Sequence, residues 1–517
     1  MTDVRQLQSL TRETAAAAPV FTPAAPAASA FPFAPLGRAV PGQSLLGRRF
    51  LIVTAPFGPF GRALADALQA EGASVARMLF NAGDAASWRR SGAVPYTGDV
   101  RRWPQRLARL VQDQGLTDLI VFGEGGPYNQ GVLSQRDKLK ALAATHTVEY
   151  DAEATGDAND QRRAQAASDR VASVSATQHR RAQAASDRVA SVSAGAGANH
   201  PLRIWVLENG YFRPDWITVE ENGVNASSGL PRRAQAYDPP IPEILPTRPA
   251  GRILPHHVVN ISLYHMVQPL GRLVFRRYVY PYTQSPWLQF AGHVKRFLGL
   301  TFASRSEADA EVIRARGPFF IACLQREGDA QLLRYSHFAD NTAFLAEVLT
   351  SFARHAPADA RLVVKNHPLD PGLVDLRRMT HVLAVERGIA DRVDFIDGGN
   401  LAQLCRASSG MVVNNSSAAL SAMGFKTPVK VLGDAFFDIE GLADQKPIDA
   451  FWTHPTPPDD ALFHRFRAHV IARTPATARD AVARCWTAPY VVGVTRGRRI
   501  GFAGVRGGQG HERVALG

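Results

Sequence analysis

The chain has 517 residues, and its 59 Lys and Arg against 46 Asp and Glu give a formal net charge of +13. The length predicts two to four domains at roughly 100–200 residues each. A composition of 45% hydrophobic and 20% charged residues excludes a fibrous or wholly disordered chain. Cys323, Cys405 and Cys485 are too far apart for a disulfide framework or a cysteine-based zinc site. No stretch approaches the roughly 18 uninterrupted apolar residues that span a bilayer, so we expect a soluble or peripherally attached protein.

Two stretches of the chain alternate short apolar runs with helical patterns, which is typical of βαβ units and a parallel sheet. The first is expected to hold strands at 51–54, 75–80, 119–122 and 204–207, with helices at 62–70 and 103–114. The second is expected to hold strands at 319–324, 362–365, 393–396, 411–413 and 429–432, with helices at 342–355, 373–387, 401–407 and 418–425. We therefore predict an α/β fold with two Rossmann-like, doubly wound domains that face a cleft.

Shifts in composition predict the domain boundaries. In chain order, the predicted regions are a disordered leader at 1–46, a first Rossmann-like domain at 47–229, a linker with a basic and aromatic helical segment at 230–315, a second Rossmann-like domain at 316–455 and a tail at 456–517. The first domain carries an insertion at 151–200, in which RRAQAASDRVASVSA occurs twice, at 162–176 and 180–194. Two copies are too few for a solenoid, so we interpret the insertion as an exposed loop.

Residues 256–300 interleave basic and aromatic side chains and contain no Asp or Glu. This pattern suits an anionic membrane surface or single-stranded nucleic acid, and the alternative is a solvated basic helix pair that covers the domain junction. Because no RNA-binding or helix-turn-helix pattern accompanies the charge, we expect no nucleic-acid partner. The basic residues of the segment are Arg272, Arg276, Arg277, Lys295 and Arg296.

Two motifs follow predicted strands of the first domain. The glycines of GPFG at 58–61 would let backbone N–H groups approach an anion, but a tight turn without a ligand explains them equally well. In VLENGYFRPDWIT at 206–218, Glu208 ends a strand and is a candidate general base. Arg213 either pairs with a substrate carboxylate or phosphate, or forms an ion pair with Asp215 that holds the turn.

The motif KNHPLDPG at 365–372 follows a strand of the second domain. Pro368 restricts the backbone of the residue before it to extended conformations. This predicts a fixed imidazole at His367 in the cleft, beside Lys365. Such a pair suits the binding of a phosphodiester leaving group, and the alternative is that His367 is a satisfied structural residue.

Two more motifs follow strands of the second domain. In LQREGDAQ at 324–331, Gln325 is either a hydrogen-bond partner of a sugar or base, or a structural residue. In VNNSSA at 413–418, Ser416 and Ser417 either cap the next helix only or also help its N–H groups to hold phosphate. The chain contains no HExxH, GxSxG or paired CxxC motif and no DxD pair in the cleft, so we expect neither a zinc hydrolase, a serine esterase nor a bound metal.

In chain order, the sequence contains the motifs GPFG with NAGD (81–84), GYFRPDWIT (210–218), RLVVKNHPLDPG (361–372), DRVDFIDGG (391–399), the turn 415–417, PVKVLG (428–433) and PIDAFW (447–452). In this order they resemble the motifs of the capsule polysaccharide biosynthesis/export family. Within that family they are most similar to the single-module β-Kdo transferases that begin the glycolipid anchor of bacterial capsules. The similarity covers about 47–150 and 200–455.

The resemblance implies a GT-B-like architecture, CMP-β-Kdo as the donor, retention of the β configuration, and a phosphatidylglycerol or lysophosphatidylglycerol acceptor. It implies no metal and no further cofactor. In this chain the catalytic residues would be Glu208 and His367. The donor-binding residues would be Gln325, Lys365, His367, Pro368, Asn415, Ser416 and Ser417. The acceptor-side residues would be Gly58, Phe60, Asp84, Glu124, Tyr211 and Arg213.

The resemblance also implies a place in the cell and a set of partners. We expect a cytoplasmic protein that is peripheral on the inner face of the bacterial cytoplasmic membrane. Its basic and aromatic segment would dock to anionic lipid. Other capsule assembly and export proteins are the expected protein partners.

This chain departs from the family pattern on the acceptor side. Where the family usually has E-E-G-Y or E-D-G-F, this chain has an amide, Asn209, at the second position, and an amide cannot accept a proton. Either Glu208 takes over as the base, or the chain is a catalytically impaired member that acts as a scaffold in capsule assembly. The family motif FGD-x-RPYH is FGEGGPYN at 122–129 in this chain.

Overall fold

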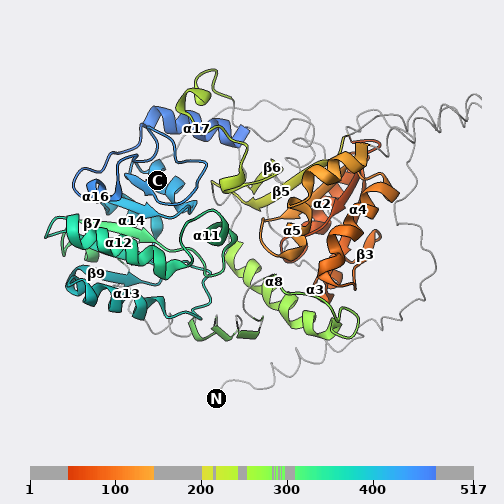
Figure 1. Ribbon diagram of the computed structural model, residues 1–517, viewed down its shortest axis with the longest axis horizontal. Helices are drawn as coiled ribbons and strands as arrows, with labels where there is room; N and C mark the ends of the chain where they lie inside the picture. The colour runs from red at the N-terminus through yellow and green to blue at the C-terminus, as the bar shows by residue number, and fades with distance from the viewer. Residues whose placement is uncertain are drawn as a thin grey trace, which may run out of the picture.

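The computed structural model describes residues 45–144, 201–212, 217–242, 253–281 and 309–472, with residues 285, 287–288, 291–292 and 294–296 between the last two ranges (Figure 1). Side chains of the helix at 253–267 are described from residue 260 onward. The predicted leader up to 44, the insertion at 151–200 and the tail from 473 lie outside the described residues.

The first sheet has six strands in the order β3-β2-β1-β4-β5-β6. Strands β1 to β5 are parallel, and β6 runs antiparallel to β5 at one edge. The strands are β1 (Arg49–Ile52), β2 (Ser74–Leu79), β3 (Ala93–Pro95), β4 (Asp118–Phe122), β5 (Arg203–Asn209) and β6 (Ile217–Glu221). The strand order reverses between β1 and β4, as in a Rossmann fold.

The second sheet has five parallel strands in the order β11-β10-β7-β8-β9. They are β7 (Phe319–Cys323), β8 (Arg361–Lys365), β9 (Val393–Ile396), β10 (Gly410–Val413) and β11 (Val429–Val431). Its first strand is central, and the order reverses between β7 and β10, so it repeats the topology of the first sheet. The structure therefore confirms the predicted α/β fold with two doubly wound domains, arranged as in a GT-B protein (Figure 1).

Helices connect the strands and cover the sheets (Figure 1). In the first domain they are α2 (Phe60–Ala70), α3 (Ala82–Trp88), η1 (Val100–Arg102), α4 (Trp103–Gln114) and α5 (Pro127–Leu133). The connecting region holds η2 (Asn225–Ser227), η3 (Ala234–Tyr237), α8 (Ile253–Val267) and η4 (Gln268–Gly271). In the second domain they are α10 (Ala310–Arg314), α11 (Ala330–Arg334), α12 (Asn341–His355), α13 (Leu376–Glu386), η6 (Ala390–Arg392), α14 (Leu401–Ala407), α15 (Ala418–Gly424), α16 (Ile448–Phe451) and α17 (Asp460–Ala472).

Each sheet has a hydrophobic core on both faces. Along β1, Phe50 and Leu51 point to opposite sides, because successive side chains of a strand alternate. The core on the Phe50 side includes Leu64 and Leu68, which lie four residues apart on one side of α2. Burial of a leucine side chain contributes about 1.5–3 kcal/mol, so the helices are held mainly by these faces.

The structure differs from the sequence prediction at short or edge elements. Every predicted strand is present, but β3 and β6 were not predicted. β3 has only three residues, and Val94 is its one buried side chain, so the segment has no run of apolar residues that would mark a strand. The predicted second domain ended at 455, whereas α17 extends it to Ala472 and buries Phe463 and Phe466.

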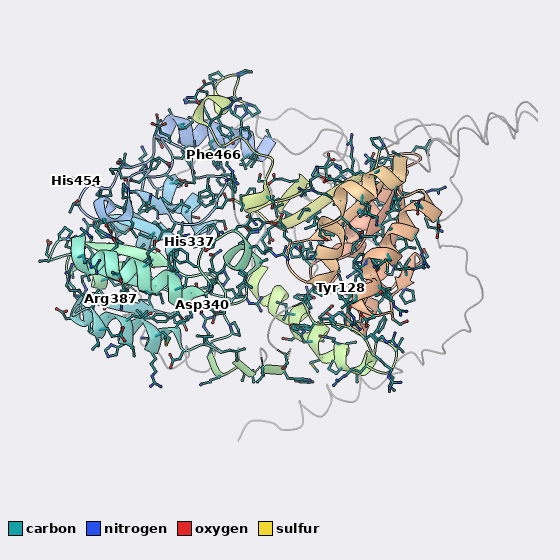
Figure 2. The ribbon with its side chains drawn as sticks, viewed as in Figure 1. Tyr128, His337, Asp340, Arg387, His454 and Phe466 are labelled. Carbon is teal, nitrogen blue, oxygen red and sulfur yellow. The ribbon has the colours of Figure 1, made fainter. Side chains whose placement is uncertain are left out.

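Residues on either side of β6 already pack against the second domain, earlier in the chain than predicted. Tyr211, Leu230 and Tyr237 belong to the core that covers one face of the second sheet. The ring of Tyr237 lies 5.0 Å from that of Phe466 in α17. Phe466 is labelled in Figure 2. The residues from 230 onward, predicted as a linker, therefore start as part of the core of the second domain.

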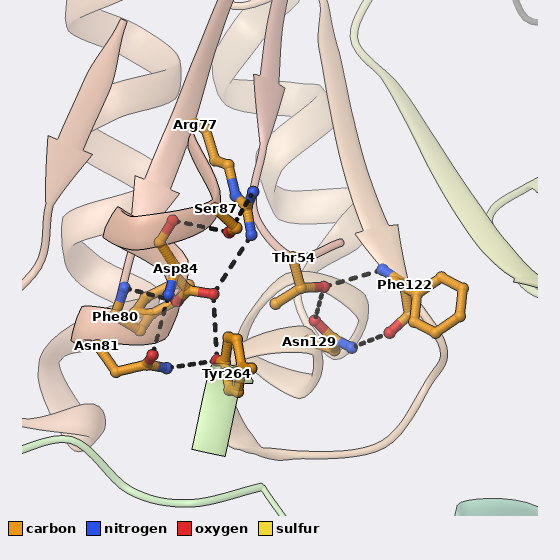
Figure 3. A network of polar contacts seen from close by, with 9 residues as sticks. All are labelled: Thr54, Arg77, Phe80, Asn81, Asp84, Ser87, Phe122, Asn129 and Tyr264. Carbon is orange, nitrogen blue, oxygen red and sulfur yellow. Dashed lines mark hydrogen bonds and ion pairs between the residues drawn. The ribbon is translucent and has the colours of Figure 1, made fainter. Parts of the chain in front are cut away.

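Helix α8 docks on the first domain through a buried polar network, shown in Figure 3. The Tyr264 hydroxyl donates to Asp84 Oδ1 (3.2 Å) and accepts from Asn81 Nδ2 (2.7 Å). Arg77 forms an ion pair with Asp84 at 3.3 Å. Burial raises the pKa of the Asp84 carboxyl, and the Arg77 guanidinium opposes this shift. The NAGD motif thus joins α3 to α8.

We expect Gly83→Ala to weaken this docking. A Cβ at Gly83 would lie 2.6 Å from the Tyr264 ring, and overpacking of this kind costs about 1–3 kcal/mol. Alanine has a better helix propensity than glycine by about 1 kcal/mol, so any loss must come from the steric clash. The midpoint of urea unfolding should fall. Gly229→Ala, with no atom within 4 Å of its Cβ, is the matched control, and an unchanged midpoint for Gly83→Ala would contradict the role of this contact.

Candidate functional site

The strand order of the two sheets indicates where a ligand binds. In doubly wound sheets, ligands bind outside the carboxyl ends of the strands at the point where the order reverses. These points lie between β1 and β4 and between β7 and β10. The loops after these four strands carry GPFG, FGEGGPYN, LQREGDAQ and VNNSSA, and KNHPLDPG follows β8, which pairs with β7. The predicted motifs therefore gather at the carboxyl edges of the two sheets.

Buried amides join the loop after β7 to the loop after β10. The Gln325 side chain donates to Asn415 Oδ1 (2.7 Å) and accepts from Asn414 Nδ2 (3.0 Å). Asn415 Nδ2 donates to the backbone carbonyls of Gln331 and Tyr335, at 3.0 Å each. A buried amide has no water to replace a lost partner, so this network fixes both loops against α11. Gln325 and Asn415, which were predicted to bind the donor, thus position the loops around them.

Two buried residues that the sequence analysis did not single out extend this network. The Asp370 carboxylate accepts the N–H groups of Glu327 (3.1 Å) and Gly372 (2.7 Å), which ties the loop after β8 to the loop after β7. Asn341 Nδ2 donates to the carbonyl of Gln325 (2.9 Å), and Asn341 Oδ1 accepts the N–H of the same residue (3.2 Å). Asp370 lies inside KNHPLDPG, which was a usable signal, whereas no motif marks Asn341.

The loop after β8 holds the imidazole of His367 in one orientation. The N–H of Leu369 donates to His367 Nδ1 (3.1 Å), and the N–H of His367 donates to Asn366 Oδ1 (2.8 Å). A ring nitrogen that accepts a hydrogen bond carries no proton, so the neutral ring has its proton on Nε2. Pro368 sits between the two residues of this turn. The ring is therefore preorganised as a hydrogen-bond donor at Nε2.

Lys365 ends β8 with its side chain buried, at 8% exposed. Among the described residues, its ammonium has no hydrogen-bond or ion-pair partner. Burial lowers the pKa of Lys365, and the Cys323 thiol and the Asp397 carboxylate oppose this shift. A buried charge without a partner is costly, and a bound anion would supply the partner. Lys365 is thus the described residue of this edge best suited to attract a phosphate.

Ser416 and Ser417 lie between β10 and α15. The Ser416 hydroxyl accepts the N–H of Ala418 (3.3 Å), whereas Ser417, at the N-cap position, forms no side-chain capping bond. Capping therefore occupies only the first serine. The predicted role of both residues at a nucleotide remains a prediction.

Glu208 lies at the carboxyl end of β5, next to the loop after β4. A Cβ on Gly123 would lie 3.4 Å from Glu208 Oε2, so the carboxylate lies close to this loop. Glu208 Oε1 accepts the N–H of Asn209 (2.9 Å). Because strand side chains alternate, Asn209 points to the opposite side of the sheet, and it is exposed. The carboxylate next to the loop after β4 is therefore that of residue 208.

Glu124 connects the first domain to the second. Its buried carboxylate accepts the N–H of Val224 (2.9 Å), the Ser227 hydroxyl (3.4 Å) and Gln331 Nε2 (3.5 Å). Gln331 belongs to α11 of the second domain. The predicted acceptor-side acid thus contacts both domains.

Tyr211 is also placed at the domain contact. Its hydroxyl donates to Glu220 Oε1 (2.7 Å) and accepts the N–H of Asn225 (2.6 Å), and its ring lies 4.3 Å from that of Phe436 in the second domain. Burial raises the pKa of Glu220, and hydrogen bonds from Ser228 and Tyr211 oppose the shift. Tyr211 therefore supports the interface through both its ring and its hydroxyl.

The other predicted acceptor-side residues form a separate group near α8. Gly58 has a φ of +91°, and a Cβ there would lie 2.7 Å from Asn260 Cγ of α8, so the GPFG turn requires glycine. Phe60 begins α2 and packs against the core of the first sheet. Asp84 is committed to the network with α8. Arg213 lies outside the described residues.

Comparison with known proteins places the chain in a family. Residues 183–477 match the family described as capsule polysaccharide biosynthesis protein. The chain belongs to the capsule polysaccharide biosynthesis family. The matched range includes the end of β5 and the loops after β7, β8 and β10. The family match thus includes the carboxyl edge of the second sheet, where the buried amide network lies.

Individual relatives agree with this assignment. The capsule polysaccharide modification protein LipB of Neisseria meningitidis serogroup A is 30% identical over 447 residues, which cover 83% of this chain and 90% of LipB. The capsule polysaccharide export protein KpsS of Escherichia coli is 26% identical over 441 residues, which cover 84% of this chain and 97% of KpsS. Among solved structures, the β-Kdo 2,7 transferase KpsC of Thermosulfurimonas dismutans aligns with a TM-score of 0.35 and 13% identity, over 82% of this chain and 90% of KpsC.

The helices differ from membrane spans in length and hydrophobicity. Within the part of the chain that the structure describes, none is both long and apolar enough to cross a membrane.

We expect Lys365→Met to stabilise the fold at neutral pH. Because the pKa of Lys365 is lower in the folded state, folding opposes its protonation, and this cost is complete below the folded pKa. As the pH rises from the folded pKa toward the unfolded value of about 10.5, the cost disappears. The free energy of unfolding should therefore increase by about 1–3 kcal/mol at pH 7, and the gain should shrink above that pKa.

Urea unfolding at several pH values measures this effect. Lys138→Met, at an exposed position, is the control and should leave the midpoint nearly unchanged. A destabilised Lys365→Met protein would mean that the ammonium has a stabilising partner in the native state.

Proposed function

We propose that the protein is a glycosyltransferase that transfers β-Kdo from CMP-β-Kdo to a phosphatidylglycerol or lysophosphatidylglycerol acceptor. The observation that carries the proposal is that the carboxyl end of β8 and the loop after it hold both the oriented ring of His367 and the buried Lys365, whose ammonium has no hydrogen-bond or ion-pair partner among the described residues. An N–H donor beside an ammonium is suited to a phosphate group. Membership of the capsule polysaccharide biosynthesis family supports a sugar donor of the kind implied by the sequence motifs.

On the donor side, the chain's own residues would stabilise the leaving group. The bond that breaks joins the anomeric carbon of Kdo to a phosphate oxygen of CMP, so negative charge grows on that phosphate. His367 Nε2–H and the Lys365 ammonium would stabilise this charge in a site prepared before the reaction. Ser416 and Ser417 would contact the nucleotide, and Gln325 with Asn415 would hold that loop in place. In this proposal, neither a metal nor an organic cofactor takes part.

On the acceptor side, Glu208 would take the proton of the attacking hydroxyl. The new bond joins the anomeric carbon to the acceptor oxygen, and the hydroxyl proton moves to the carboxylate. Glu208 lies at the carboxyl end of β5 beside Gly123, whereas the exposed Asn209 points away. This geometry favours an active enzyme with Glu208 as its base over the alternative of an impaired scaffold.

A lipid acceptor requires the protein to reach a membrane. The turn after α8 exposes Leu270 and Leu273, at 79% and 87%, next to the exposed cations Arg272, Arg276 and Arg277. Apolar side chains among cations suit insertion into an anionic bilayer surface. We therefore place the protein peripherally on the inner face of the cytoplasmic membrane, where it would meet other capsule assembly and export proteins.

Product formation tests the reaction. Purified protein, a fluorescent phosphatidylglycerol acceptor and CMP-Kdo generated in situ should yield a product heavier by one Kdo. We expect His367→Ala to lose donor binding without unfolding. Glu208→Gln should still bind CMP but lose a factor of about 10²–10⁴ in rate, because the amide cannot accept a proton.

Asn209→Glu is the matched variant for the base. An unchanged rate would support Glu208, whereas a large gain would show that the second position normally carries the base and that this chain is impaired. CMP binding without any product in all variants would support the scaffold alternative. Full CMP affinity in His367→Ala would overturn the donor site.

Vesicle flotation tests the membrane surface. Leu270→Ser/Leu273→Ser should bind phosphatidylglycerol vesicles at least about tenfold more weakly, because each buried leucine contributes roughly 1.5–3 kcal/mol. Val385→Ser, at a 54% exposed position on α13, is the control and should bind like the unmodified protein. Equal binding of both variants would rule out this turn as the docking site.

A further inference from the structure

One basic residue of the segment 256–300 does not face solvent. The sequence pattern groups Arg296 with Arg272, Arg276, Arg277 and Lys295, which are all exposed. The Arg296 side chain is only 10% exposed. It lies against the loop after β8, the same loop that carries His367.

The guanidinium of Arg296 contacts acceptors on this loop and directly after β9. Its Nε donates to Asp397 Oδ2 (2.9 Å), and its Nη2 donates to Asp397 Oδ1, which makes a bidentate ion pair. Its Nη1 donates to the carbonyl oxygens of Pro368 (3.0 Å) and Asp370. The segment also packs closely here, because a Cβ on Gly292 would lie 2.4 Å from the carbonyl oxygen of Pro371.

These contacts lead to His367 by two short routes. In the first, Asp397 Oδ1 also accepts Asn366 Nδ2 (3.2 Å), and Asn366 Oδ1 accepts the N–H of His367 (2.8 Å). In the second, the carbonyls that Arg296 binds belong to the turn whose Leu369 N–H donates to His367 Nδ1 (3.1 Å). Arg296 thus holds both the backbone and the ring orientation of His367 without touching the ring.

We propose that Arg296 is a positioning residue for the donor site, which keeps His367 Nε2–H directed at the donor phosphate. This inference rests on the proposed function, because it assumes that His367 binds the phosphate. Arg296 belongs to the basic segment by sequence, but in this proposal it acts on the loop after β8, 72 residues away in the sequence, and not at the membrane surface.

The chemistry of the site requires arginine rather than any cation. A guanidinium has five N–H donors in a planar fork, which matches a carboxylate and two carbonyls at once. A lysine ammonium carries the same charge but cannot bind a carboxylate in the same bidentate geometry. Arg296→Lys should therefore retain folding and still lose part of the donor affinity.

Calorimetric titration of the full-length protein with CMP tests the proposal. We expect Arg296→Ala to bind CMP about tenfold or more weakly, Arg296→Lys to lie between it and the unmodified protein, and added guanidinium ion to restore part of the affinity of Arg296→Ala. In the transfer assay, KM for the donor should rise while KM for the lipid acceptor stays constant. A purely structural loss would change both and would not respond to guanidinium.

Arg316→Ala is the matched control, because it removes an ion pair at 2.8 Å to Asp394 of β9, three residues before Asp397, while Arg361 still pairs with that aspartate. It should bind CMP normally. Asp397→Asn, which removes the charge and keeps the shape, should weaken CMP binding in the same direction as Arg296→Ala. Failure of the unmodified protein to bind CMP would refute the proposed function itself. Normal binding by the unmodified protein and by Arg296→Ala alike would refute only the role of Arg296.

Discussion

The candidate site depends on amide groups that have been removed from water. Once the Gln325 side chain is buried between Asn414 and Asn415, each hydrogen bond that it loses leaves an unpaired polar group, at a cost of about 1–3 kcal/mol. This penalty forces the loops after β7 and β10 into one arrangement. The loop after β8 then joins them through Asp370. The carboxyl edge of the second sheet is therefore held in one arrangement by groups that are both polar and buried.

The same edge also contains a buried cation that has no partner among the described residues. Lys365 is surrounded by protein, and burial lowers its pKa, but no described acceptor reaches its ammonium. The neighbouring Asp397 could have paired with it, yet that carboxylate is engaged by Arg296 and Asn366. The arrangement thus keeps a cation available in a low-dielectric place, at a cost to stability. This is the pattern expected where a phosphate is to be bound.

The two domains are linked by contacts of different character. Near Tyr211 and Tyr237, aromatic rings from the first part of the chain pack into the core of the second domain. A second contact is polar, with Gln331 of α11 donating to the Glu124 carboxylate. Helix α8 docks on the first domain through Tyr264. The segment after this helix contacts the second domain through Arg296, at the loop after β8 and at Asp397. One stretch of chain thus contacts both domains, which links the proposed membrane surface to the proposed donor site.

The sequence by itself determined the strands, their alternation with helices, and the motifs at their carboxyl ends. Those features depend on local hydrophobic periodicity and on Gly and Pro, which act over a few residues. A strand that is very short and largely exposed, such as β3, could not be predicted from these local patterns. Only the tertiary structure decided which charges are paired. Arg296 and Arg276 are both cations of one basic segment, and nothing local distinguishes them. The first is buried because Asp397 and two carbonyls happen to converge on it from another domain, and such long-range convergence leaves no trace in the neighbouring sequence.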